Sequence, residues 1–428
     1  MNLPIAFEQK MKNILGSEYD AFIKEFEMPR TKAFHLNPLR TPSGYIPSIS
    51  GDPVPGSKDC YYYEYDRIST LPEYQAGMIY SQDPAATRPI SALLPMLKGN
   101  ELVLDLCAAP GGKTSQLAAH LPEGLLVSNE INPQRNKILI SNIERMGYDN
   151  VYVTKLLPAE LAAFYPLTFD ICVCDAPCSG EGMFRKYPES VNEWSPENVI
   201  LCQNRQKEIL QSAFEMIKPG GYLVYSTCTY SPEEDEMISD YITQNHFNSV
   251  LDTPEGVKLY PHRFKGEGQY YNIFRKEGTS TVSNVRPAAV KPVSGGTLKL
   301  IKEALKDNFD YSKVTFIDYK SRIIILPVSA IALPSYGLTM AGITAGEIDK
   351  NRFIVHHQLF HSLGKYFNNR VELSDINELN AYLQGQEIIH SDVHNGYGVV
   401  TYMGQPVGGF KASNNRLKNH YPKGLRLI

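Results

Sequence analysis

FDICVCDAPCSGEG, residues 169–182, carries the pattern on which the predicted fold rests. An apolar run from Ile171 to Cys174 ends in Asp175, and a proline, a cysteine and a glycine-rich turn follow. A short apolar run bounded by turn residues is typical of a buried strand in a parallel sheet. Because ligands of open α/β sheets bind beyond the carboxyl ends of the strands, Asp175 and Cys178 are the first candidates for a functional site.

The same order of strand, turn and helix recurs from residue 71 to residue 276. Strands are predicted over 101–106, 125–130, 151–155, 169–175 and 221–227, with a late antiparallel strand over 268–276. Helices are predicted over 114–120, 133–146, 196–217 and 232–244. This alternation predicts an α/β domain with a doubly wound, largely parallel sheet of the Rossmann-like kind.

Smaller units flank this domain. Residues 1–70 combine helical spacing with a strand-like tyrosine run and predict a small N-terminal α/β unit. Residues 277–296 lack any periodicity and are rich in Ser, Thr, Val, Pro and Gly, which is typical of a linker. Residues 297–360 predict a mixed α+β module, and residues 361–428 predict a β-rich module with glycine turns.

The composition is that of an ordinary globular protein. Hydrophobic residues make up 43% and charged residues 21% of the 428 residues. The net charge of -4 excludes a chain that is basic throughout, so a nucleic-acid-binding surface must be local, and the basic segment 411–428 is one candidate. The N-terminus is too charged for a secretory signal. No apolar run reaches about 18 residues, so we expect no membrane span.

The chain has 7 cysteines, an odd number, which favours reduced thiols and a cytoplasmic location. Cys172, Cys174 and Cys178 are closely spaced, but the first two share one face of a strand. No CxxC pair or histidine cluster completes a zinc site, so we expect no metal. We expect a monomer.

The loop DLCAAPGGKT, residues 105–114, joins the first strand of the predicted sheet to its first helix. Its small residues let backbone N–H groups approach a ligand closely. The end of the loop matches a Walker phosphate loop, but Cys107 stands at the first glycine position and Pro110 removes a donor. The dinucleotide fingerprint GxGxxG is also absent. The loop therefore favours an adenosine ligand without phosphates, such as S-adenosylmethionine.

Two residues of the next strand and helix complete the predicted cofactor site. Glu130 ends the second predicted strand, roughly 20 residues after the loop, where an acid can accept both ribose hydroxyls. Arg135, on the following helix, is either a second contact or a solvent-facing residue.

Thiols and a carboxylate after strand ends predict covalent chemistry on a pyrimidine. A thiolate that adds to C6 of cytosine makes C5 nucleophilic enough to attack a sulfonium methyl group. The reaction also needs a carboxyl group for the N3/N4 edge of the base and a way to eliminate the thiol. Asp175 supplies the carboxyl, and Cys178 and Cys228 can both face its cleft. The residues alone do not decide which thiol attacks, and an ordinary structural role for both stays open.

Three motifs together resemble the hallmarks of the Sun/Fmu-like (NSUN) family of S-adenosylmethionine-dependent RNA cytosine-C5 methyltransferases. They are DLCAAPGGKT (105–114), DAPCSGEG (175–182) and STCTYSPEEDE (226–236), and they occur in the family's order. The C-terminal module and the extension DAPCSGEGMFRK resemble the bacterial RsmF-type branch, which methylates small-subunit (16S) ribosomal RNA.

The resemblance implies a role for each candidate residue. Cys228 would be the nucleophile, Cys178 would help to release the product, and Asp175 would contact the cytosine and lie near the cofactor. The cofactor-binding residues would be Glu130, Arg135, Asp175 and the loop residues Cys107, Ala108, Ala109, Pro110, Gly111, Gly112 and Lys113.

The resemblance also implies RNA-binding units at both ends of the chain. In the N-terminal unit, residues 37–40 (NPLR) match an element of the family, and residues 361–428 would form a PUA-like module. The expected partner is RNA, either 16S rRNA or the small ribosomal subunit, with transfer RNA or a non-catalytic assembly role as alternatives. One feature departs from the family: the usual acid that contacts adenine is absent from residues 154–158, and Glu160 is a displaced candidate.

Overall fold

A large mixed sheet in the middle of the chain positions the candidate site. The computed structural model describes residues 2–279, 291–305, 309–319, 321–327, 337–350, 352–390 and 392–427. The strand order is β10-β12-β9-β8-β5-β6-β7-β15, and β11 also pairs with β12. The strands are β5 (Leu102–Asp105), β6 (Leu125–Asn129), β7 (Val151–Thr154), β8 (Phe169–Asp175), β9 (Ile217–Thr227), β10 (Phe247–Ser249), β11 (Val257–Leu259), β12 (Gln269–Lys276) and β15 (Leu338–Ala341).

The parallel centre of this sheet brings the chemical motifs to one edge. Strands β5 to β9 pair in parallel, whereas β12 pairs with β9 in the antiparallel direction. Asp175, the last residue of β8, lies opposite Ser226 of β9, and Tyr270 of β12 lies opposite Thr227. Cys178 and Cys228 therefore both follow strand ends at the same edge, as the sequence predicts.

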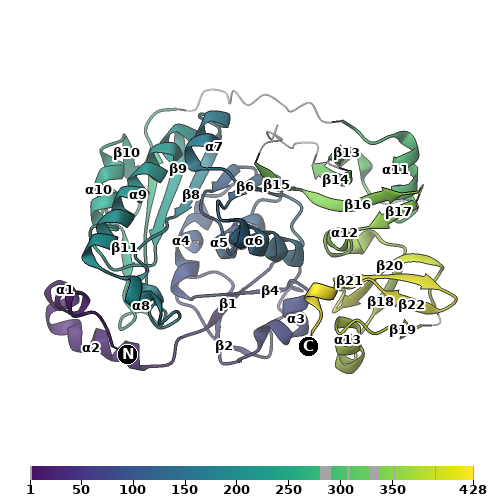
Figure 1. Cartoon of the computed structure of the whole chain (residues 1–428), viewed down its shortest axis with the longest axis horizontal. Coiled ribbons are helices and arrows are strands. Elements are labelled where there is room, and N and C mark those ends of the chain that lie inside the picture. Colours follow the sequence, from purple (N-terminus) through teal and green to yellow (C-terminus); the bar gives the residue numbers. More distant parts are fainter. Residues whose placement is uncertain are drawn as a thin grey trace.

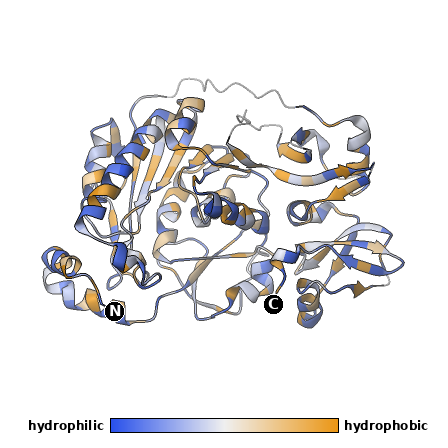
Figure 2. Ribbon diagram, in the orientation of Figure 1, coloured by the Kyte–Doolittle hydropathy of each residue, from blue (hydrophilic) through white to orange (hydrophobic). Residues whose placement is uncertain are grey.

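Helices cover both faces of the sheet, which confirms the doubly wound α/β fold (Figure 1). One apolar core joins the sheet to α4, α5 and α6, and another joins it to α7, α9 and α10. The strands are mostly hydrophobic and the outer faces of the helices hydrophilic (Figure 2). The helices are α4 (Arg88–Leu93), α5 (Gly112–Ala118), α6 (Pro133–Met146), α7 (Pro158–Phe164), α8 (Ser190–Glu193), α9 (Pro196–Met216) and α10 (Glu236–Thr243).

Two of the predicted helices begin at other residues in the structure. Helix α5 begins at Gly112, two residues before the predicted start, because Gly111 adopts the left-handed conformation (φ 110°) and directs the chain into the helix. Helix α10 begins at Glu236 instead of residue 232. The side chains of Glu234 and Asp235 accept hydrogen bonds from Ser179 and Thr227, and these contacts hold the segment outside the helix.

The N-terminal residues serve two different parts of the molecule. Strands form a small sheet in the order β2-β3-β1-β4, which β4 completes after residue 70. Helices α1 and α2 pack instead against residues 184–199 near the candidate site, through an aromatic core that contains Phe7, Phe22 and Trp194. The elements are α1 (Ile5–Leu15), α2 (Tyr19–Lys24), β1 (Ala33–Leu36), β2 (Ser50–Pro53), β3 (Cys60–Tyr63), α3 (Pro72–Gln75) and β4 (Ile79–Gln82).

The C-terminal residues form two more sheets, in the orders β13-β14-β16-β17 and β18-β20-β21-β22-β19. The first group comprises α11 (Gly295–Lys302), β13 (Val314–Tyr319), β14 (Arg322–Pro327), β16 (Ile343–Asp349), β17 (Arg352–Val355) and α12 (His357–Leu363). The second comprises β18 (Asn369–Glu372), α13 (Ile376–Leu383), β19 (Ile388–Ile389), β20 (Gly396–Tyr402), β21 (Gln405–Ser413) and β22 (Arg416–Asn419). Much of the linker expected over 277–296, namely residues 280–290, lies outside the described residues.

Contacts over long sequence distances tie these parts together. Strand β15 extends the large sheet by pairing with β7. The N-terminal sheet and the last module share one core, in which Phe34 and Met78 pack with Phe410 and Tyr421. Among the described residues, no helix combines the length and the apolar character needed to cross a bilayer.

The NPLR element lies inside this junction. Asn37 is fully buried and donates to the carbonyls of Gly77 and Met146. The buried guanidinium of Arg40 donates to the backbone carbonyls of Ala76, Pro406 and His361. In this structure Arg40 therefore ties the N-terminal sheet to the C-terminal module.

Candidate active site

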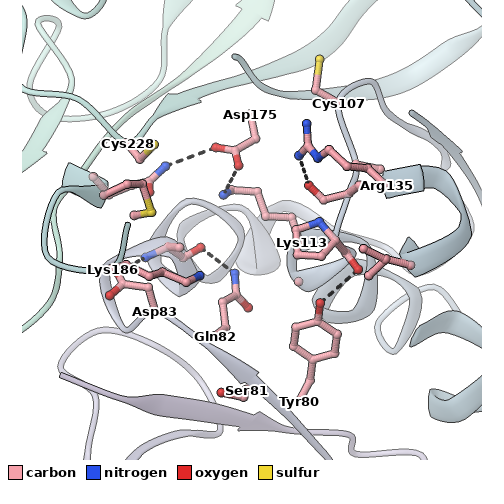
Figure 3. Close-up of a pocket in the computed structure, with 18 of the residues that line it drawn as sticks. Tyr80, Ser81, Gln82, Asp83, Cys107, Lys113, Arg135, Asp175, Lys186 and Cys228 are labelled. Carbon is pink, nitrogen blue, oxygen red and sulfur yellow. Dashed lines mark hydrogen bonds and ion pairs between the residues drawn. The ribbon is translucent and has the colours of Figure 1, made fainter. Parts of the chain in front are cut away.

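A cavity of about 530 Å³ opens at the carboxyl edge of the large sheet (Figure 3). This volume lies within the usual range for small-molecule sites. The cavity wall combines the 105–113 loop, the ends of β8 and β9, the start of β12, strand β4 and the segment 183–187. Asp175, Cys228 and most of the predicted cofactor loop are part of this wall.

The two candidate thiols lie in direct contact. The sulfur atoms of Cys178 and Cys228 are 3.3 Å apart, and Cys228 is the one that lines the cavity. The hydrogen bond to Cys228, together with burial, raises the pKa of the Cys178 thiol well above its usual value. Cys178 therefore remains protonated at neutral pH, and its S–H group can donate to the sulfur of Cys228.

The Asp175 carboxylate is fixed between donors from three elements. Lys113 Nζ lies 2.8 Å from Oδ2, and the buried Ser226 hydroxyl donates to Oδ1 over 2.6 Å. The Gln269 amide donates to the same Oδ1 over 3.3 Å. These contacts orient Asp175 into the cavity beside Cys228 (Figure 3).

Cys107 contributes backbone, not a reactive thiol, to the cavity. Its sulfur points away from Asp175 and Cys228 in Figure 3. A hydrogen bond with Cys107, followed by burial, raises the pKa of Cys174 well above its usual value. Cys172 and Cys174 are both fully buried in the sheet, where they act as core residues.

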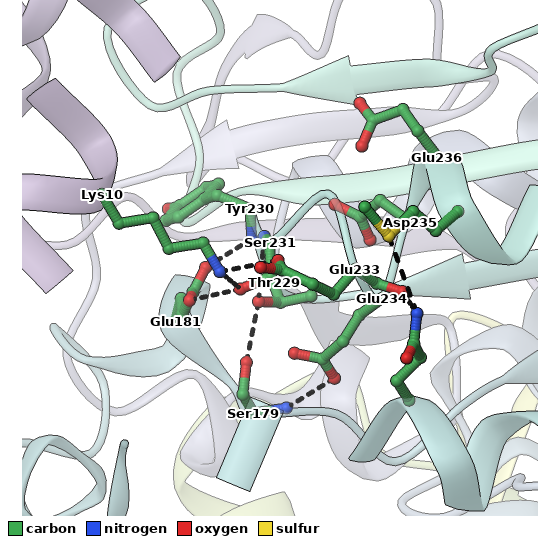
Figure 4. Close-up of polar contacts among 12 residues, drawn as sticks. Lys10, Ser179, Glu181, Thr229, Tyr230, Ser231, Glu233, Glu234, Asp235 and Glu236 are labelled. Carbon is green, nitrogen blue, oxygen red and sulfur yellow. Dashed lines mark hydrogen bonds and ion pairs between the residues drawn. The ribbon is translucent and has the colours of Figure 1, made fainter. Parts of the chain in front are cut away.

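The loops that carry the two thiols are bound directly to one another (Figure 4). Gly182 N donates to the carbonyl of Cys228 over 2.8 Å, and the hydroxyls of Ser179 and Thr229 are 2.9 Å apart. The fully buried Glu181 accepts from Tyr230 N over 2.8 Å and from the Ser231 hydroxyl over 2.6 Å. Because each contact joins residues 179–182 to residues 228–231, the relative position of the two sulfurs is firmly set.

Two more charged residues brace these loops from outside. Glu234 accepts from Ser179 N over 3.0 Å and from the Gln206 amide over 2.8 Å, and burial raises its pKa to about 7. Lys10, from helix α1, donates to the Ser231 hydroxyl over 2.7 Å and to Glu233 over 2.8 Å. The N-terminal helices thus contact the loop of Cys228 directly (Figure 4).

Asp105, which lines the cavity at the start of the cofactor loop, has a buried carboxyl oxygen without a partner among the described residues. Asp105 Oδ2 accepts from the Thr114 hydroxyl over 2.7 Å, whereas Oδ1 has no partner among the described residues. Burial raises the pKa of Asp105 to about 7. S-adenosylmethionine carries an ammonium and a sulfonium group, and a buried acid with a free oxygen suits such a cation. The residues present therefore fit this cofactor.

Glu130 and Arg135 meet at the same loop, but only Arg135 lines the cavity. Arg135 donates to the carbonyl of Ala109 over 2.6 Å, and its other nitrogen lies 3.4 Å from Glu130. Glu130 also accepts from Asn132 N over 2.8 Å. The ribose contact of Glu130 stays a prediction.

Glu160 is engaged elsewhere. Its carboxylate accepts from Leu157 N over 2.9 Å at the start of α7, and Glu160 is not among the residues that line the cavity. An adenine contact through Glu160 stays a prediction.

Several cavity residues were not found from the sequence. Strand β4 contributes Tyr80 and Gln82, the segment after Cys178 contributes Lys186 and Tyr187, and β12 contributes Gln269. The motif extension MFRK at 183–186 is the one signal that could have pointed to part of this wall. The others arrive through sheet pairing between distant segments, which no local pattern reveals.

Comparisons with known proteins agree with this site. Residues 92–275 match the family described as 16S rRNA methyltransferase RsmB/F. Residues 3–84 match the N-terminal domain of 16S rRNA methyltransferase RsmF, and residues 368–427 match the methyltransferase RsmF PUA domain. The matches account for both ends of the chain as well as for the large sheet.

A relative from Vibrio vulnificus, named ribosomal RNA small subunit methyltransferase F, is 30% identical over 99% of this chain and 97% of its own length. The structure of a methyltransferase homologue from Pyrococcus horikoshii is 26% identical, with a TM-score of 0.55 over 63% of this chain and 94% of that one. NSun6 from the same organism, solved with the S-adenosylmethionine analogue SFG, shares the fold at 18% identity, with a TM-score of 0.54 over 64% of this chain and 99% of that one. The chain therefore belongs to the 16S rRNA methyltransferase RsmB/F family and is an S-adenosylmethionine-dependent RNA methyltransferase.

Proposed function

We propose that the enzyme methylates C5 of cytosine in 16S ribosomal RNA through a covalent adduct with Cys228. The observation that carries this proposal is the 3.3 Å contact between the sulfurs of Cys178 and Cys228 beside the Asp175 carboxylate. A thiol and an acid at the cavity wall, with a second thiol in contact with the first, are the groups that addition, base recognition and elimination require. An ordinary structural pair of cysteines would need neither a cavity nor an oriented carboxylate.

The first step is addition of the Cys228 thiolate to C6, which forms an S–C6 bond and places the electron pair at C5. Asp175, held by Lys113 and Ser226, meets the N3/N4 edge of the base and orients the ring for attack by Cys228. C5 then takes the electrophilic methyl group that bound S-adenosylmethionine would supply, as the S–CH3 bond breaks and S-adenosylhomocysteine leaves. The target base has to leave its stack to reach the cavity, at a cost of a few kcal/mol.

The last step reverses the addition. The proton on C5 passes to water, its bonding pair restores the C5=C6 double bond, and the S–C6 bond breaks with Cys228 leaving as a thiolate. Cys178, whose thiol keeps its proton, donates a hydrogen bond to the leaving sulfur and lowers the cost of expelling it. Cys178 is thus assigned to product release and Cys228 to attack.

The substrate assignment rests on the relatives and on the modules at both ends of the chain. The relative from Vibrio vulnificus carries a small-subunit name and aligns over nearly the whole chain. The N-terminal and PUA-like units are proposed to hold the RNA around the target. Because the proposed substrate is ribosomal RNA, the enzyme is proposed to work in the cytoplasm.

Bisulfite sequencing of ribosomal and transfer RNA tests this function. RNA from a deletion strain is compared with RNA from strains that carry the wild type or Cys228→Ala. We expect a 16S cytosine that is protected from conversion only with the wild-type gene. Protection that appears only in transfer RNA would reject the substrate assignment, and unchanged protection with Cys228→Ala would reject the nucleophile.

A further inference from the structure

We propose that Gln269 reads the 4-amino group of the target cytosine. The inference rests on the proposed function, which it deepens by naming the residue that distinguishes one pyrimidine from another. Gln269 is the first residue of β12 and lies outside the three motifs at residues 105–114, 175–182 and 226–236.

The fold places Gln269 beside the nucleophile. Strand β12 runs antiparallel to β9, and Tyr270 lies opposite Thr227. Gln269 is therefore next to the point where the chain leaves β9 as Cys228. Gln269 lines the cavity, and only 2% of its surface is exposed. A buried amide at a cavity wall is held in one orientation and can act as a selective contact.

The hydrogen bonds of this amide leave its oxygen available. Nε2 donates to Asp175 Oδ1 over 3.3 Å. Oε1 has no hydrogen-bond partner among the described residues, and it is not sealed from solvent. The amide oxygen is thus an acceptor that faces the cavity.

The charge and donor pattern around Asp175 explains why a second acceptor is needed. Lys113 approaches Oδ2, while Ser226 and Gln269 donate to Oδ1, so protein donors already contact both carboxylate oxygens. The 4-amino group of cytosine brings two N–H donors to the same edge. The Gln269 oxygen can accept one of them, whereas the O4 acceptor of uracil would face it unpaired. A site built this way favours cytosine, because a buried acceptor without its donor is costly.

A substrate that lacks only the 4-amino group tests the contact. RNA fragments carry either cytosine or 2-pyrimidinone at the position mapped by the bisulfite experiment, and single-turnover methyl transfer is measured with each. The variants are Gln269→Met, which keeps the length and loses both polar atoms, and Ser226→Ala. Ser226→Ala is the matched control because it removes another donor to the same Asp175 oxygen without changing the cavity wall.

The expected pattern is a loss that depends on the substrate. Gln269→Met should slow transfer to cytosine by about 10-fold to 100-fold, and transfer to 2-pyrimidinone by no more than about 2-fold. Ser226→Ala keeps the Gln269 acceptor and acts only through Asp175, so its ratio of cytosine to 2-pyrimidinone rates should stay closer to the wild-type ratio than that of Gln269→Met. An equal loss on both substrates with Gln269→Met, or the same change of this ratio in the two variants, would overturn the proposal, because Gln269 would then only position Asp175.

Two further measurements keep the test decisive. Gln269→Asn retains the amide but shortens the side chain, so it should show the same pattern if the methionine variant fails to fold. Cofactor affinity, measured by calorimetry, should be unchanged in both variants. Wild-type enzyme that transfers no methyl group to the cytosine RNA would reject the proposed function itself, and this outcome is visible before any variant is compared.

Discussion

Replacing Gly182 with alanine should disrupt catalysis by moving the loop of Cys228. A Cβ at this position would lie 2.9 Å from the carbonyl oxygen of Cys228 and 3.0 Å from that of Glu267. It would also lie 3.2 Å from the carbonyl oxygen of Gly268. All three neighbours are backbone atoms, so a side chain cannot simply rotate away. The Gly182 N–H also donates to the Cys228 carbonyl over 2.8 Å. Because the added Cβ would push this carbonyl away, it would also weaken the hydrogen bond.

The magnitude follows from the displacement required. Ordinary contact needs a few tenths of an ångström more space, and overpacking of this kind costs about 1–3 kcal/mol of stability. A misplacement of about 1 Å in a catalytic group can cost about 100-fold in rate. We therefore expect single-turnover methyl transfer by Gly182→Ala to fall by about 10-fold to 100-fold, with cofactor affinity unchanged.

Gly180→Ala is the control in the same loop. Its Cβ would meet nothing within 4 Å, but its φ of +73° is strained for alanine. It should lose about 1 kcal/mol of stability and keep its rate within about threefold of the wild type. Urea unfolding and methyl-transfer kinetics measure both quantities. A Gly182→Ala enzyme with wild-type kinetics, or equal rate losses in the two variants, would show that the added Cβ does not displace the loop of Cys228.

Three further predictions use the charged residues around the site and the junction. Burial raises the pKa of Glu234 from 4.5 to about 7, so its contribution to stability is complete below pH 4.5 and is lost as the pH rises through 7. In urea unfolding, Glu234→Gln should have a higher free energy of unfolding than the wild type at pH 8 but not at pH 5, and the gain should be at most roughly 3 kcal/mol. An equal difference at both pH values would contradict this. Arg40→Met should lower the free energy of unfolding by about 2–4 kcal/mol, because three buried carbonyls lose a charged donor, and an unchanged denaturation midpoint would argue against that junction. Glu130→Ala should weaken cofactor binding by about 10-fold in calorimetry if Glu130 holds the ribose, and unchanged affinity would exclude that role.

The central sheet is predictable from sequence because its strands are encoded locally. The stretch 169–175 contains an apolar run and is followed by turn residues, and β8 has the predicted bounds. Helix α6 is predicted from residue 133 to residue 146 and forms there, because Asn132 caps it, Pro133 begins it and Gly147 ends it in the left-handed conformation. Parallel pairing then brings Asp175, Cys178 and Cys228 to one edge without further information.

Other parts of the site depend on contacts that no local pattern encodes. Gln269 reaches the cavity because β12 pairs with β9, and Lys10 reaches the loop of Cys228 from the other end of the chain. Arg40 matches an element expected to bind RNA, yet its guanidinium donates hydrogen bonds to backbone carbonyls from three segments. Strand β15 likewise joins the large sheet from beyond the predicted linker.

Trapping a covalent protein–RNA complex tests most directly whether Cys228 attacks the base and Cys178 releases the product. Cys178→Ala is incubated with substrate RNA and S-adenosylmethionine, resolved on a denaturing gel, and the attached residue is mapped by mass spectrometry. We expect an accumulated adduct on Cys228, and none in Cys178→Ala/Cys228→Ala. An adduct on another residue, or a Cys178→Ala enzyme that turns over normally and traps no RNA, would contradict it.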